Sequence, residues 1–266
     1  MRNLVNNLDH YPTLNQLRDE YKKGQPFNYV VIDNFFKEEI AEQLANEFPD
    51  YNNDDVWNIY KNPLENKRLT PDWNLFPPLT YEAFTFLNTP EFIKKIEWII
   101  GAENVKPDMG LHGGGWHVTP GGGKLNIHLD YSIHPKLKME RRANLIIYLS
   151  HWKPEWDGAL QLWSHDYETN MPKECVSKVE VKFNRAVIFD TTQNSWHGLP
   201  DEIKAPSNVL RKSLNIYYLT EPREGISTRE RALFAPHTNQ KDDENIKELI
   251  KKRSSSSTIH EAYRTE

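Results

Sequence analysis

Cysteine is almost absent from this sequence, which holds one, Cys175, among 266 residues. A single cysteine excludes an internal disulfide and a zinc site built mainly from cysteines. It suits a reducing cytoplasm, and we expect that location because the opening MRNLVNNLDHYP lacks the apolar run of a signal peptide. No apolar stretch approaches the length that spans a membrane, so no membrane partner is expected.

A strong excess of charge of one sign is missing as well. The formal net charge is −5, and 38% of the residues are hydrophobic. This balance gives no overall attraction to nucleic acid or to an anionic membrane, so no nucleic-acid partner is expected. The length and the apolar content allow a sizeable core in one domain.

The hydrophobic period changes near Lys106. Before it, apolar residues three and four apart predict helices, and one strand is expected at Tyr29–Ile32. The predicted helices are 37–48, 80–87 and Pro90–Ile100, the last with Thr89 as its cap and Pro90 at its first position. After Lys106, alternation of apolar and polar residues predicts strands at 111–119, 124–130, 144–149, 159–163, 178–182, 186–189 and 211–220.

Three segments follow from this change of period. Residues 1–105 are expected to pack helices and one strand on a barrel, and residues 106–222 are expected to form the β core. Residues 223–266 are expected to add one helix, at 242–253, and a flexible polar end from Ser254 onward. Short strands broken by Gly, Pro and Asp predict an antiparallel sandwich or barrel, so the fold class is mainly β with flanking helices.

At one place in the chain a histidine is followed two residues later by a carboxylate, in His128-Leu129-Asp130. Residues two apart in a strand point to the same side, so both side chains can reach one ion. His197, in SWHGLP beyond an apolar strand, is the candidate for a third ligand from a distant segment. Two imidazoles and one carboxylate on one face of a metal form the ligand set of non-haem Fe(II) oxygenases. We therefore predict a metal site at these three residues.

The stretches around these residues resemble a known family. They are GGGKLNIHLDYSIHPKLKMERRANLIIYLSHWKPEWDGALQLW, FNRAVIFDTTQNSWHGLP and RKSLNIYYLT, in the order in which the family carries its motifs. From about Met109 to Thr220 the chain is similar to the prolyl-4-hydroxylase-like 2-oxoglutarate/Fe(II) dioxygenases, in particular to bacterial and viral members. The resemblance implies a double-stranded β-helix, the jelly-roll form shared with cupins. It also implies Fe(II), 2-oxoglutarate as cosubstrate and O2, with ascorbate as an optional reductant.

The strand predicted at 211–220 offers two cations for the distal carboxylate of 2-oxoglutarate. Alternation puts Arg211 and Ser213 on a polar face and Lys212 on the opposite, mostly apolar face. A buried arginine needs an anionic partner, and its planar fork suits a carboxylate, to which the Ser213 hydroxyl can add a hydrogen bond. Prolyl 4-hydroxylases of the collagen type use a lysine on this strand, so Lys212 is the rival, but its face favours Arg211.

Three aromatic residues are candidates for ligand contacts. Tyr148, in NLIIYLS, is similar in position to a tyrosine that contacts the same carboxylate in the family, and packing between strands explains it nearly as well. Trp116 and Tyr131 lie on either side of the His128 strand, and we expect them either at the substrate mouth or in the core. In one subset of the family a tyrosine precedes the Pro-Gly turn, where this chain has Thr119.

The resemblance implies hydroxylation of an aliphatic C–H bond, with release of succinate and CO2. The substrate stays open among a prolyl or other peptide residue, a free amino acid and a sugar. Asp130 argues against a halogenase, which needs a small residue there to free a metal position for chloride. Two further classes stay open: a catalytically silent jelly roll that binds a metal or ligand and acts through partners, and a cupin-like isomerase, which would leave Arg211 and Ser213 unexplained.

Overall fold

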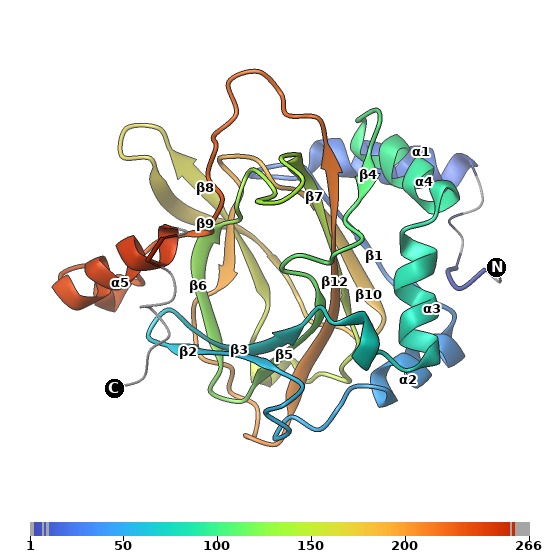
Figure 1. The fold of residues 1–266 in the computed structure, drawn as a ribbon, viewed down its shortest axis with the longest axis horizontal. Helices are drawn as coiled ribbons and strands as arrows, with labels where there is room; N and C mark the ends of the chain where they lie inside the picture. Colours follow the sequence, from blue (N-terminus) through green and yellow to red (C-terminus); the bar gives the residue numbers. More distant parts are fainter. Residues whose placement is uncertain (1–2, 7, 9–10, 256, 259–266) are drawn as a thin grey trace.

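The protein is a rolled antiparallel sheet with helices on its outside (Figure 1). The computed structural model describes residues 3–6, 8, 11–255 and 257–258, so most of the polar end that we predict to be flexible lies outside the described residues. The strands are β1 (Tyr29–Ile32), β2 (Asn58–Asn62), β3 (Glu65–Thr70), β4 (Lys106–Pro107), β5 (Gly115–Pro120), β6 (Lys124–Leu129), β7 (Glu140–Tyr148), β8 (Leu160–Asp166), β9 (Met171–Val179), β10 (Arg185–Asp190), β11 (Trp196–Leu199), β12 (Leu210–Thr220) and β13 (Leu233–Phe234).

Antiparallel pairing joins these strands into one sheet. Its main path runs β1-β10-β7-β12-β5-β3-β6-β11-β8-β9. Off this path, β2 pairs with β3, β4 with β12 and β13 with β6. Neighbours in the sheet are mostly distant in sequence, as expected of a jelly roll. β3 closes the roll because it pairs with both β5 and β6. The predicted class, mainly β with a double-stranded β-helix core, is confirmed.

Helices cover the outside of the sheet in two places (Figure 1). The helices are α1 (Tyr11–Lys23), α2 (Glu38–Asn46), α3 (Pro78–Leu87), α4 (Pro90–Ile100) and α5 (Glu244–Ser254). The first four lie together on one side of the roll, and α5 lies on the opposite side. Among the described residues, none of these helices has the length and apolar content needed to cross a bilayer.

The largest apolar core lies between α1–α4 and the outer face of the sheet. Alternate residues of β12, Leu214, Ile216 and Tyr218, are buried in this core with residues of the helices. The intervening residues of the same strand face the interior of the roll, where a second apolar cluster fills part of the space. Period-two alternation thus divides β12 into a packing face and an interior face.

Helix prediction was accurate where end signals are strong. α4 has the predicted bounds, and the Thr89 hydroxyl accepts a hydrogen bond from the Phe92 N–H at 3.3 Å. α5 begins after Asp243, whose carboxylate accepts hydrogen bonds from the backbone at Asn245 and Ile246. In both helices the cap side chain accepts hydrogen bonds from N–H groups of the first turn, which have no carbonyl partner within the helix.

Two strands before Lys106 were not predicted, so the expectation of a single strand there was wrong. β2 and β3 form a hairpin, and β3 then inserts between β5 and β6. Their sequences, NIYKN and ENKRLT, are largely polar. Neither apolar alternation nor β-branched content marks such a hairpin, and its partners are more than forty residues downstream.

Two further strand predictions need correction, and a short strand was missed. The strand expected at 111–119 begins only at Gly115, and the strand expected at 178–182 is β9, Met171–Val179. β9, MPKECVSKV, holds mostly polar or exposed residues and only one buried residue, Val179, so no apolar alternation marks it in the sequence. β11 was not predicted as a strand, because four residues are too few to show a period.

Trp116 belongs to the core and not to a substrate mouth. Its side chain is 1% exposed, and its ring packs edge-on against Phe76 at 4.9 Å between centroids. Phe48 and Trp57 complete its aromatic surroundings. Trp116 precedes the interior-facing His117 in β5, so alternation turns it outward, under the helices.

Replacing Trp116 by alanine should therefore destabilise the protein strongly. Loss of a buried tryptophan leaves a cavity, and we expect the free energy of unfolding to fall by about 3–5 kcal/mol. Urea unfolding and the melting temperature measure this loss. Tyr167→Ala is the matched control, because that side chain is 79% exposed, and its unfolding curve should coincide with that of the wild type. Equal stability of the Trp116→Ala protein would contradict the packing described here.

Candidate active site

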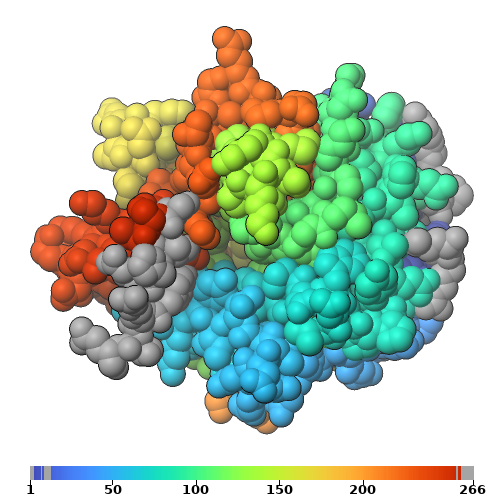
Figure 2. Space-filling model, in the orientation of Figure 1, coloured from blue at the N-terminus to red at the C-terminus, as the bar shows by residue number. Residues whose placement is uncertain are grey.

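A cavity of about 380 Å³ opens into the interior of the roll. Strands β2, β3, β5, β6, β7, β11 and β12 contribute to its wall, as does the segment that leads into β13. This segment lies against the loop after β6, where Ser132 donates its N–H to the Arg229 carbonyl (Figure 2, orange and yellow-green). The three predicted metal ligands line this cavity, and so do Arg211 and Ser213.

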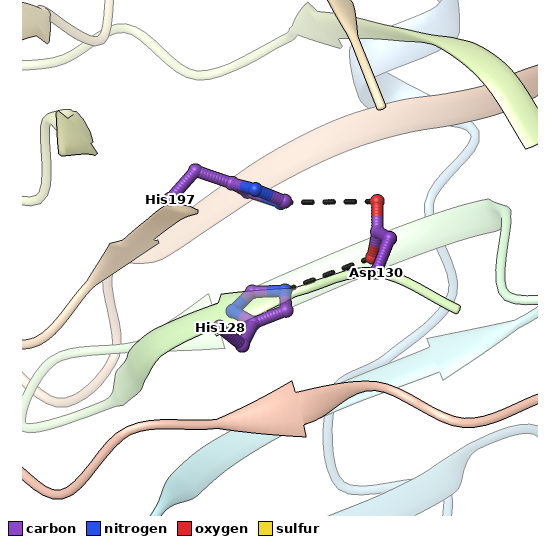
Figure 3. A group of neighbouring side chains, drawn as sticks. All are labelled: His128, Asp130 and His197. Carbon is purple, nitrogen blue, oxygen red and sulfur yellow. Dashed lines mark ion pairs between the residues drawn. The ribbon is translucent and has the colours of Figure 1, made fainter. Parts of the chain in front are cut away.

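His128, Asp130 and His197 point toward one another inside this cavity (Figure 3). His128 and His197 are direct partners across β6 and β11, and their rings lie 4.4 Å apart between centroids. The Asp130 carboxylate lies 3.8 Å from the Nε2 atom of each histidine, one oxygen to each. One potential ligand atom from every residue of the trio falls within 4.8 Å of the others.

Both histidines present the same nitrogen to the centre of the trio. His128 Nδ1 lies 2.9 Å from the Asn126 carbonyl, and His197 Nδ1 lies 2.8 Å from the Ser195 carbonyl. A carbonyl accepts only, so each Nδ1 carries the proton and each Nε2 keeps a free lone pair. Burial lowers the pKa of His128 to about 3 and also lowers the pKa of His197, which keeps both rings neutral.

Asp130 has an oxygen atom without a hydrogen bond. Oδ2 is buried and has no hydrogen-bond partner among the described residues. Burial alone would raise the pKa of Asp130. The nearby positive charges together outweigh burial, and the pKa lies below its usual value; the strongest of them is the Arg141 guanidinium, with Nη1 3.5 Å from Oδ1. An ionised, buried oxygen with no donor is costly unless a cation is near.

The donor set fits one divalent ion of the iron type. Metal–ligand bonds of about 2.1 Å would set neighbouring ligand atoms roughly 3 Å apart. The Asp130 oxygens lie 3.8 Å from the histidine Nε2 atoms, so the side chains would need to move together only slightly. Two neutral imidazoles with their distal nitrogens held by carbonyls, and one carboxylate, form the facial set of non-haem iron enzymes. The side chains therefore have the chemistry, the protonation and the spacing that such an ion requires.

Arg211 and Ser213 line the cavity from β12, as alternation predicts. Arg211 Nε donates to the Gly158 carbonyl at 2.9 Å, and Nη2 donates to the Tyr148 hydroxyl at 3.2 Å. The side chain is 6% exposed, and no carboxylate of the described residues forms an ion pair with it. The Ser213 hydroxyl donates to the Asn215 side chain at 2.7 Å.

Lys212 and Tyr148 have other positions. Lys212 points away from the cavity and donates to the Ala45 carbonyl at 2.9 Å, beneath the helices. Tyr148 is fully buried and, among the described residues, lies behind Arg211 without itself lining the cavity. Its hydroxyl orients the guanidinium, so its contact with a bound molecule would be indirect.

Tyr131 lines the cavity, so of the two aromatic residues considered for the mouth it is the one found there. Its hydroxyl donates to the His112 carbonyl at 3.0 Å, and its ring covers the Arg141 guanidinium at 3.3 Å. Tyr217 covers the other face at 3.2 Å. Arg141 is thereby clamped between two rings beside Asp130.

Arg141 and Arg229 are functional candidates that the sequence pattern did not reveal. Counting alternately back from Asn144 in β7 would turn Arg142 inward and Arg141 outward. A bulge opposite Tyr218 and Leu219 shifts the register, so Arg141 faces the cavity. Arg229 comes from the distant segment before β13 and donates twice to the Asp130 carbonyl, at 2.8 and 3.2 Å.

Residues 114–219 match the family model of the 2OG-Fe(II) oxygenase superfamily. The match spans 106 of the 266 residues of the chain. The matched region includes the His128–Asp130–His197 trio and Arg211. A comparison with curated proteins finds no match.

Several solved structures share the fold of this chain. A prolyl-4-hydroxylase from Pseudomonas putida is similar at a TM-score of 0.53 and 15% identity, over 77% of this chain and 100% of that one. The carbocyclase SnoK from nogalamycin biosynthesis is similar at 0.54 and 13%, over 88% and 89%. HygX from Streptomyces hygroscopicus, solved with nickel, 2-oxoglutarate and hygromycin B, is similar at 0.51 and 12%, over 77% and 90%. Identities this low establish the fold alone.

The metal-free protein should lose stability as the pH falls below about 6.5. Burial lowers the pKa of folded His128 to about 3, whereas an unfolded histidine titrates near 6.5. Between these values the unfolded chain takes up a proton that the folded state excludes, which costs up to about 1.4 kcal/mol per pH unit. Urea unfolding at pH 7.5, 6 and 5 should show a shallower pH slope for His128→Gln than for the wild type.

His151→Gln is the control for this pH series, because the His151 side chain is 71% exposed. Its slope should equal that of the wild type. If His128→Gln keeps the full wild-type slope, His128 is not a buried neutral imidazole and the described tautomer is wrong.

Proposed function

We propose that this chain is an Fe(II)- and 2-oxoglutarate-dependent oxygenase that hydroxylates an aliphatic C–H bond. One O2, one 2-oxoglutarate and the substrate would yield succinate, CO2 and the hydroxylated product. The observation that carries the proposal is the presence, in one cavity, of the trio His128–Asp130–His197 and a buried arginine with no carboxylate partner among the described residues.

The trio would hold the metal. Each histidine would bind through Nε2, and the carbonyls of Asn126 and Ser195 would fix the ring orientation through Nδ1. Arg141 and the clamp around it would hold the Asp130 carboxylate in place and ionised. Bound Fe(II) would supply the reduction of O2 and the attack on the C–H bond, chemistry that no side chain of the chain offers.

Arg211 would bind the distal carboxylate of 2-oxoglutarate. A buried guanidinium without a counter-ion is unfavourable, and a dicarboxylate cosubstrate supplies the missing charge. The Gly158 carbonyl and the Tyr148 hydroxyl each occupy one edge of the guanidinium, which fixes its plane. Ser213 lies two residues along the same face and would add a hydroxyl donor.

Replacing any one ligand, by His128→Ala, Asp130→Ala or His197→Ala, should abolish succinate formation. The affinity for Mn(II), measured by calorimetry, should fall by more than the roughly 10–100-fold that outer-shell substitutions cost. His151→Ala, in an exposed histidine, should bind Mn(II) as the wild type does. Activity near the wild-type level in the Asp130→Ala protein with added iron would exclude this metal site.

Arg211→Ala should raise the KM for 2-oxoglutarate far more than the KM for the prime substrate. Truncating one partner of a buried charge pair costs about 2–5 kcal/mol, which is tens to thousands of fold. Lys212→Ala is the matched control on the next residue and should leave both constants nearly unchanged, because its side chain lies under the helices. The reverse outcome would assign the cosubstrate to Lys212.

A further inference from the structure

The cavity carries more positive charge than the proposed metal and cosubstrate use. Two carboxylates line it, Asp130 and Glu230, against five cations, Lys67, Arg141, Arg211, Arg231 and Arg253. The excess is local, because the whole chain has a net charge of −5. A ferrous ion and the two carboxylates of 2-oxoglutarate would cancel each other and leave this excess in place.

Three of the five cations already have a partner or a role. Arg211 is assigned to the cosubstrate. Arg141 approaches Asp130 and donates to the His112 carbonyl at 2.7 Å. Arg253, on α5, donates through Nε to the fully buried Glu65 carboxylate at 3.0 Å. The unexplained charge is therefore that of Lys67 and Arg231.

Lys67, on β3, has a loose ion pair and a distant contact of its Nζ with the Tyr60 ring, 5.6 Å from the ring centroid. Its Nζ is 3.6 Å from Glu65 Oε2, a carboxylate that Arg253 also engages. The side chain is 15% exposed, and burial lowers the pKa of Lys67. The Glu65 carboxylate thus pairs with two partly buried cations, so it offsets the charge of the Lys67 ammonium only in part.

Arg231 has no carboxylate partner among the described residues. Its Nε is buried and, within the same residues, has no hydrogen-bond acceptor. The segment that carries it is fixed close to the trio, because Arg229 binds the Asp130 carbonyl and Phe234 pairs with His128. Arg231 itself lines the cavity.

Lys67 and Arg231 line the same cavity. Tyr60 is the cross-strand partner of Lys67 and lines the cavity beside it. Arg231 lines the same cavity as Lys67 and Tyr60. The two cations come from β3 and from the segment just before β13, and both β3 and β13 pair with the ligand strand β6.

We propose that Lys67 and Arg231 bind an anionic group, a carboxylate or a phosphate, on a small prime substrate. This inference rests on the proposed function, since the substrate would react in the same cavity. A guanidinium fork and an ammonium both donate charge-assisted hydrogen bonds to such oxygens. The cavity volume of about 380 Å³ lies at the low end for ligand pockets, which favours a small molecule.

The test compares pairs of molecules that differ only in the anionic group. The pairs are L-amino acids with their amides, hexose phosphates with free hexoses, and nucleoside monophosphates with nucleosides. Calorimetry measures their binding to the full chain, metal-free and loaded with Mn(II) and 2-oxoglutarate. Succinate formation with Fe(II) is measured in parallel. The anionic member of at least one pair should bind at least about tenfold more tightly than its neutral partner and should stimulate succinate release.

Variants then assign the anion to its residues. Lys67→Met and Arg231→Met should each weaken binding of that anionic member on the order of tenfold or more, while the affinity for 2-oxoglutarate changes less than about twofold. Lys178→Met, in an exposed lysine of β9, is the matched control and should change neither. The pair that responds identifies the group as a carboxylate or a phosphate.

Other outcomes overturn the inference. Equal binding of the neutral member in every pair, or no binding by any anionic member, would show that the excess charge serves no substrate. Equal loss of 2-oxoglutarate affinity in the Lys67 and Arg231 variants would assign both residues to the cosubstrate. Failure of the proposed function would give a different result. The Mn(II)-loaded protein would then not bind 2-oxoglutarate at all. Titrations of the metal-free protein would still measure binding at the anion site.

Discussion

The antiparallel pairing of β6 with β11 is the constraint on which the rest of the site depends. It sets His128 directly opposite His197, although 69 positions separate them in the sequence. A slip of one residue in this register would turn one imidazole out of the cavity. Gly198 follows His197 at a point where an added Cβ would lie 2.7 Å from the Leu125 carbonyl oxygen. A side chain there would push the two strands apart, so the close approach of the strands depends on this glycine.

Around this pairing, the chain accepts an electrostatic cost that only bound ions can offset. An ionised aspartate oxygen has no donor among the described residues, and several cations share few carboxylates in the same cavity. Such arrangements destabilise a folded protein unless ligands complete them. The apolar core under the helices and the aromatic clamp around Arg141 hold the charged groups in position, and the bound metal and anions would then offset the cost.

Sequence reasoning succeeded where a pattern is local. The spacing of His128 and Asp130, the alternation along β12 and the Thr89 cap each depend on neighbouring residues, and each was found as expected. It failed where tertiary pairing decides the outcome. The polar hairpin β2–β3 forms because the edges of β5 and β6 are available to it, and this is how Lys67 reaches the cavity.

The same limit applies to single side chains. Arg141 faces the cavity because of a bulge against β12, which no alternation pattern predicts. Arg231 reaches it from beyond the region that matches the family model. The sequence puts Trp116 on a strand beside the ligand strand, and this position suits a core residue and a residue at the substrate mouth equally. Only its packing in the structure shows that it is a core residue.

A crystal structure of the protein with Mn(II) and 2-oxoglutarate, grown without O2, tests the central claim most directly. We expect one metal ion bonded at about 2.0–2.2 Å to His128 Nε2, an Asp130 oxygen and His197 Nε2. We also expect the far carboxylate of 2-oxoglutarate to lie against Arg211. A metal bound elsewhere, or a carboxylate held by Lys212 or by Lys67 and Arg231 in place of Arg211, would contradict that claim.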